Sequence, residues 1–93
     1  MKRYILLLIL LTSSSFAGVN LAWNPSPDKT VVGYKIYYGT NPDLFQYSIK
    51  VGNINKYTVN NLKHQKTYYF IVTGYNRKGV ESLPTNEVSY YQK

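Results

Sequence analysis

The feature that most constrains this chain is a series of short runs in which apolar residues recur at every second position. Val19, Leu21 and Trp23 alternate with Asn20 and Ala22, and the same spacing returns in residues 34–38, 45–51, 57–59, 68–74 and 88–90. A period of two places the apolar side chains on one face of a strand. No stretch after Gly18 has the apolar spacing of a helix. The pattern therefore predicts an all-β domain.

The segments between these runs are rich in residues that end strands. Asn-Pro-Ser-Pro-Asp occupies residues 24–28, and Gly-Thr-Asn-Pro-Asp occupies residues 39–43. Proline fixes its own φ and cannot donate to a strand ladder, so each segment predicts a turn. Several short strands at this spacing are typical of a sandwich or a barrel.

Composition agrees with one small β domain. Aromatic residues make up 16% of the 93 residues, and eleven of them are tyrosines, which favour pleated, half-buried surfaces. The chain has no cysteine. A disulfide framework, a thiolate metal site and a cysteine nucleophile are therefore excluded.

The first seventeen residues are typical of a secretion signal. Lys2 and Arg3 precede an unbroken apolar run over residues 5–11, and Ser15 and Ala17 stand at positions −3 and −1 of a cut before Gly18. The apolar run is too short for the roughly 20 residues that span a bilayer. We expect residues 1–17 to be a signal peptide, residues 18–93 to be the folded domain, and the product to be extracellular or periplasmic without a stable membrane span.

The order of residues after Gly18 resembles a fibronectin type III domain. The marks are Trp23, the segment Gly-Tyr-Lys-Ile-Tyr-Tyr-Gly at 33–39, Leu62 followed six residues later by Tyr68, the segment 68–76, and then Gly79, Ser82, Asn86 and Glu87. The resemblance implies an immunoglobulin-like antiparallel β-sandwich of six to seven strands. It also implies a tyrosine corner, in which the hydroxyl of Tyr68 hydrogen-bonds to the main chain of the corner. The core residues expected are Trp23, Tyr34, Ile36, Leu62, Tyr68, Phe70 and Val72.

One departure from the family pattern concerns its first strand. Gly18 opens almost directly into the strand that the family places second, so strand A is missing unless the signal segment is retained and supplies it. Without it, the uncharged residues 19–24 would lie at an open sheet edge. This edge is either covered by flanking residues or accepts a strand from a partner or a second copy.

Catalysis finds little support. His64 is the one histidine, and the four acidic residues, Asp28, Asp43, Glu81 and Glu87, are scattered without the spacing of an acid–base pair. Neither a nucleophile elbow nor a phosphate-binding glycine loop is present. We expect no enzyme activity, no cofactor and no metal.

Two surfaces are candidates for binding. In the family's layout three loops share one end, and they would carry Lys29, Lys56, Arg77 and Lys78; the alternative is a set of solvated turns. The second surface is the tyrosine face, the residues that alternation points outward on three neighbouring strands: Tyr37, Tyr69, Ile71, Tyr75 and Tyr91. Tyrosine is enriched at interfaces, although cross-strand pairs of tyrosines also stabilise sheets.

These observations favour a non-catalytic secreted module for binding or adhesion, with a protein or glycan of the cell surface or envelope as its partner. Loss of Lys2 and Arg3 would lower the net charge from +7 to +5, which still favours anionic surfaces. Nucleic acid is not expected, because export would separate the protein from it. The alternative is an assembly subunit of a cell-surface or phage particle that packs through the open edge or the tyrosine face.

Overall fold

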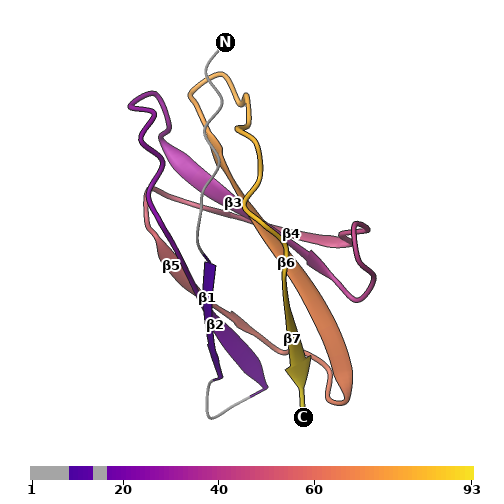
Figure 1. The fold of residues 1–93 in the computed structure, drawn as a ribbon. Coiled ribbons are helices and arrows are strands. Elements are labelled where there is room, and N and C mark those ends of the chain that lie inside the picture. The colour runs from indigo at the N-terminus through magenta and orange to yellow at the C-terminus, as the bar shows by residue number, and fades with distance from the viewer. Residues whose placement is uncertain (1–8, 14–16) are drawn as a thin grey trace.

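The chain forms seven β-strands connected by loops (Figure 1). A computed structural model describes residues 9–13 and 17–93. The strands are β1 (Ile9–Ser13), β2 (Gly18–Trp23), β3 (Gly33–Gly39), β4 (Tyr47–Val51), β5 (Lys56–Asn60), β6 (Lys66–Tyr75) and β7 (Val88–Gln92). No helix in the described ranges is long and apolar enough to cross a membrane.

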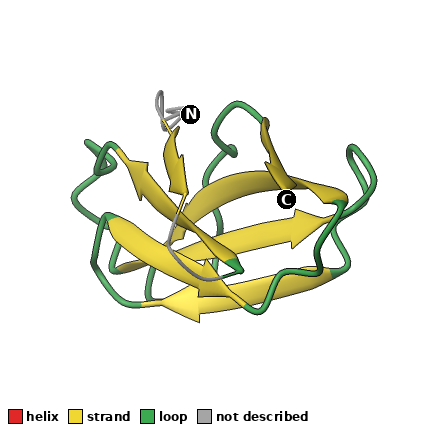
Figure 2. Cartoon of the chain, turned by 90° about the horizontal axis from the view of Figure 1, so that it is seen from below, coloured by secondary structure: helices red, strands yellow, loops and turns green. Residues whose placement is uncertain are grey.

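The strands form two facing antiparallel sheets, which Figure 2 shows as two layers. One sheet has the order β1-β2-β5 and the other has the order β4-β3-β6-β7. Every strand pair is antiparallel, as in a sandwich built from hairpins and crossovers between layers. The predicted immunoglobulin-like β-sandwich is confirmed.

The core lies between the two sheets, where the alternating apolar residues meet. On β2 the side chains of Val19, Leu21 and Trp23 are buried, whereas Asn20 and Ala22 between them are only partly buried. The rings of Trp23 and Tyr34 join the two sheets, with centroids 5.7 Å apart. The buried hydrophobic set is Val19, Leu21, Trp23, Tyr34, Ile36, Val51, Val59, Leu62, Tyr68, Phe70 and Val72, which includes all seven residues expected from the sequence.

A tyrosine corner connects β5 to β6. The ring of Tyr68 is buried, and its hydroxyl accepts a hydrogen bond of 2.9 Å from the main-chain N–H of Lys63. Leu62, also buried, begins the corner, and its N–H donates to the carbonyl of Ala17 at 3.0 Å. The corner thereby fixes the connection at the end of the sandwich where β6 begins.

The structure corrects the expectation that strand A is missing. β1 occupies that position and pairs with β2 from Ile9 opposite Trp23 to Ser13 opposite Val19. A short uncharged apolar run satisfies both a signal segment and an edge strand, so its composition could not distinguish them. Most of the signal prediction, including Lys2, Arg3 and Ser15, lies outside the described residues, and cleavage before Gly18 stays a prediction.

Candidate functional site

Two loops meet at one end of the sandwich, opposite the C-terminus (Figure 1). Residues 24–32 connect β2 to β3, and residues 76–87 connect β6 to β7. The N–H of Val32 donates to the carbonyl of Tyr75 at 2.9 Å, which ties the end of the first loop to the start of the second. This hydrogen bond joins the bases of the two loops.

The first loop is ordered by its own polar side chains. The Asp28 carboxylate accepts hydrogen bonds from the N–H of Thr30 at 2.9 Å and from its hydroxyl at 2.7 Å. The N–H of Ser26 donates to the hydroxyl of the core residue Tyr34 at 2.7 Å. Such side-chain bonds replace the ladder that the prolines of this loop prevent. Lys29 thus projects from a constrained turn.

The tip of the second loop is a tight turn organised by Asn76. The side-chain oxygen of Asn76 accepts hydrogen bonds from the N–H groups of Lys78 at 2.9 Å and Val80 at 3.0 Å. Gly79 has a φ of 83°, a conformation that side chains with a Cβ rarely adopt. Arg77 and Lys78 therefore stand at the apex of a turn whose backbone is specified by its neighbours.

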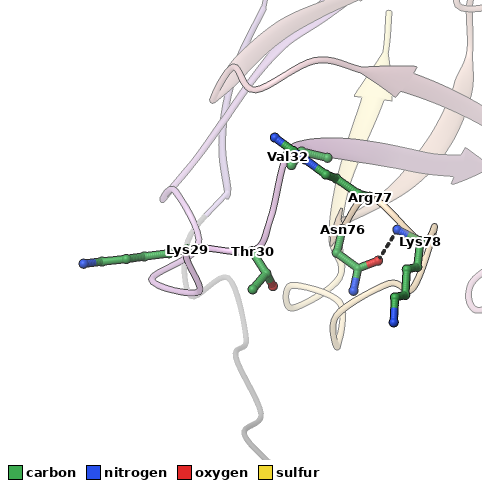
Figure 3. A pocket seen from close by; sticks show the side chains of 6 residues that line it. All are labelled: Lys29, Thr30, Val32, Asn76, Arg77 and Lys78. Atoms are coloured by element: carbon green, nitrogen blue, oxygen red, sulfur yellow. Dashed lines mark hydrogen bonds between the residues drawn. The ribbon is translucent and has the colours of Figure 1, made fainter.

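A cavity of about 510 Å³ lies between the two loops (Figure 3). We call it the loop-end cavity. Its lining residues are Lys29, Thr30, Val32, Asn76, Arg77 and Lys78. In Figure 3 the Lys29 side chain extends away from the turn that carries Arg77 and Lys78, so the three cations border the cavity without converging on one point. Three of the four predicted loop cations are thus brought together by the fold.

The fourth predicted loop cation, Lys56, lies at the same end of the sandwich but does not line the loop-end cavity. It begins β5 opposite Ala22 and lines a separate cavity of about 360 Å³ on the three-stranded sheet, with Asn20, Leu21, Tyr57 and Thr58. Lys56 therefore lies at the predicted end of the sandwich, beside the strand end at Trp23, but it borders a different cavity from the other three cations.

The tyrosine face lies on the outer surface of the four-stranded sheet. Tyr37 on β3 is opposite Ile71 on β6, and Tyr69 is opposite Ser89 on β7. Tyr91 is exposed at 54%, whereas the other four members are half-buried. The five residues therefore share a face, but only part of it is open to solvent.

The hydroxyl of Tyr37 is occupied by a contact within the protein. It donates to the Glu81 carboxylate, lying 2.7 and 2.9 Å from the two oxygens. The hydroxyl of Thr73 donates to the same carboxylate at 2.8 Å, and Lys35 Nζ lies 3.9 Å from it. Sequence reasoning missed this cluster, because Glu81 is 44 residues from Tyr37 in the chain and lies in a loop.

Electrostatics in this cluster favour an ionised Glu81. Burial alone acts to raise the pKa of Glu81, but the hydrogen bonds from Tyr37 and Thr73 and the charge of Lys35 outweigh it and leave the pKa below its ordinary value of 4.5. Burial and the hydrogen bond to Glu81 raise the pKa of Tyr37. The cluster therefore pairs a neutral phenol with a carboxylate, and this contact connects a strand to a loop within the protein.

Tyr75 is also held by the sheet. Its hydroxyl donates to the carbonyl of Val51 at 3.0 Å, and its ring crosses Gly33, where an added Cβ would collide with the phenol. Lys50 Nζ lies 4.8 Å from the centre of the ring. Tyr37 and Tyr75 thus act as cross-strand packing residues, and Tyr69, Ile71 and Tyr91 are what remains of the face for a partner.

The described residues contain no cluster of three or more histidine, aspartate or glutamate side chains that could hold a metal ion. His64 lies next to the C-terminal residue, with Nδ1 2.6 Å from the carbonyl oxygen of Lys93. Its position fits a turn residue that fastens the end of the chain.

Two facing antiparallel sheets with a tyrosine corner define an immunoglobulin-like sandwich, and sequence comparison specifies which kind. The family described as Fibronectin type III domain matches residues 9–90. The chain belongs to the fibronectin type III family, whose members are commonly binding or adhesion modules. The match begins at the first residue of β1, in agreement with the seven strands of the structure.

Similar domains occur both as a part of longer chains and as most of a short chain. The Kelch domain-containing protein SSO1033 of Saccharolobus solfataricus is 44% identical over 70 residues, which are 75% of this chain and 9% of that protein. The chicken CNTN1 FN1–FN3 domains superpose with a TM-score of 0.85 at 22% identity, covering 99% of this chain and 33% of theirs. An Fn3-like protein from Clostridium thermocellum has a TM-score of 0.71 at 25% identity, covering 98% and 88%.

Proposed function

We propose that this protein is an exported, non-catalytic binding module that recognises an anionic polymer, such as an acidic glycan of the cell surface or envelope, through its loop-end cavity. The observation that carries the proposal is the gathering of Lys29, Arg77 and Lys78 around one cavity by two loops that are 44 or more residues apart. Opposite charge attracts such a polymer over a distance of about a Debye length.

The geometry of the cations favours an extended ligand over a compact ion. The side chains border the cavity and diverge, so they match charges that are spaced along a chain (Figure 3). Glu81, which would oppose an anion, is held on the sheet by Tyr37 and Thr73 and does not line the cavity. The loop backbones are ordered by Asp28 and Asn76, which lowers the entropy lost on binding.

Removal of the loop cations should weaken binding of dextran sulfate, a polyanion probe, to the full chain. Surface cations near an anionic partner contribute about 1 kcal/mol each, so each neutralised residue should raise the Kd roughly five-fold. The double variant Arg77→Gln with Lys78→Gln tests this by titration at two salt concentrations. Added salt should narrow the difference between the variant and the native chain.

The matched control removes two charges from the opposite end of the sandwich. Lys63→Gln with Lys66→Gln changes the net charge equally but leaves the loop-end cavity intact. Equal weakening by both double variants would show that net charge, and no particular site, holds the polymer. Equal binding of uncharged dextran would exclude an anionic ligand class.

A further inference from the structure

The predicted cut before Gly18 coincides with the boundary between two strands. β1 ends at Ser13 and β2 begins at Gly18, so the cut would remove β1 whole and leave β2 whole. The apolar run 5–11 of the signal prediction overlaps β1 at residues 9–11. The same residues therefore cannot serve as the core of an export signal and as the edge strand at the same time.

Loss of β1 would expose a sheet edge that lacks the usual protection. The N–H of Trp23 donates towards β5, to the carbonyl of Asn55, so by strand alternation the polar main-chain groups of Asn20 and Ala22 point towards β1. None of the six residues of β2 is charged. Of the outer strands, β4 and β5 carry Lys50 and Lys56, whereas β7 is uncharged. Lysine on an edge strand is a common device against unwanted pairing.

We propose that export processing removes β1 and leaves an open edge at β2, and that a second copy of the processed chain pairs with this edge. β1 shows what the edge accepts: an uncharged antiparallel strand along residues 19–23. β2 has the same character, and pairing about Leu21 places Leu21 opposite its own copy and Val19 opposite Trp23 of the second copy. This register keeps every core-facing side chain on the core side.

The same register also satisfies the exposed main chain. Asn20 faces Ala22 of the second copy, and each such pair can exchange its N–H and C=O groups, as Ala22 faces Leu10 and Asn20 faces Thr12 in the structure. The two three-stranded sheets, each reduced to β2 and β5, then join into one continuous sheet with two-fold symmetry. This interface is independent of the loop-end cavity, so dextran sulfate binding does not test it.

The experiment uses the full chain, exported by a bacterial host through its own N-terminus. Mass spectrometry of the product should find a chain that begins at Gly18, and sedimentation velocity should find a dimer at micromolar concentration. Ala22→Lys, which adds an outward charge to the edge, should raise the dimer Kd at least ten-fold. Ser48→Lys adds the same charge to an exposed position of β4 and should leave the dimer unchanged.

Hydrogen exchange of the native product gives a second readout that needs no variant. The Asn20 and Ala22 amides should exchange slowly in the dimer and faster on dilution, while the Trp23 amide, bonded to Asn55, stays protected at both concentrations. A monomer that begins at Gly18, or a product that still contains residues 9–13, would overturn the proposal. So would an assembly that Ala22→Lys and Ser48→Lys affect equally.

Discussion

Single residues with a defined partner carry much of the order in this small sandwich. Tyr68 illustrates this, because its buried ring fills the core while its hydroxyl holds the N–H of Lys63 at the corner. The six-residue spacing from Leu62 made this contact predictable from the sequence. The contact between Tyr37 and Glu81 was not predictable, since it joins a strand to a loop that returns across the sheet only in the folded chain.

Tyr68→Phe should lower the free energy of unfolding by about 1 kcal/mol, because the Lys63 N–H loses its acceptor while the ring stays in place. Urea denaturation followed by Trp23 fluorescence measures this difference. Tyr91→Phe is the control, since the Tyr91 hydroxyl makes no hydrogen bond within the described part of the chain and the residue is exposed. Equal effects of the two changes would show that the corner contact contributes nothing.

Glu81→Gln should destabilise the domain in a pH-dependent way. The pKa of Glu81 is below its ordinary value of 4.5 in the folded protein, so the carboxylate contributes stability that is fully present above 4.5 and is lost as pH falls through the lower, folded-state value. The difference in unfolding free energy between native chain and variant should therefore be largest near neutral pH and shrink below pH 4.5. A difference that grows on acidification would contradict this assignment.

At the scale of elements, the segment from Glu81 to Thr85 acts as a substitute strand beside the end of β6. Thr85 accepts a 2.9 Å hydrogen bond from the N–H of Val72 through its hydroxyl and donates its own N–H to the Val72 carbonyl at 2.9 Å. Ser82 does the same for Gly74. Pro84 between them has no N–H, and the two hydroxyls accept the β6 N–H bonds that a strand carbonyl would otherwise accept. The sequence pattern predicts a loop for this segment, because its apolar residues do not alternate with polar ones.

Thr85→Val should cost about 1–3 kcal/mol of stability, since it leaves the buried N–H of Val72 without its side-chain acceptor at nearly constant volume. Thermal unfolding measures the loss. Thr58→Val makes the same chemical change at an exposed hydroxyl and should stay within about 0.5 kcal/mol of the native chain. A cost for Thr85→Val no greater than that of Thr58→Val would mean that the segment does not complete β6.

At the scale of the whole molecule, the two sheets were predictable because period-two alternation determines which side chains of each strand face the core. The buried side chains of β2, β3 and β6 follow it. Residues 9–11 of β1 were interpreted as part of a signal peptide, because a run of Ile and Leu has no alternation that would predict a strand. The loop-end cavity was predictable in part. The loops that carry Lys29, Arg77 and Lys78 follow from strand order, whereas the position of Lys56 beside a second cavity at the same end does not.

The direction of β1 decides where the polypeptide enters the module. Ile9 lies opposite Trp23, at the end that carries the cavity, while Gly18 lies opposite Asn60 and Gln92 opposite Lys66, at the far end. In a chain that keeps β1, the backbone enters at the cavity end and leaves at the opposite end, so a domain joined directly before β1 would lie near the cavity. A chain that begins at Gly18 has both of its ends at the far pole. A tether attached at that end would leave the loop-end cavity at the end that points away from the tether.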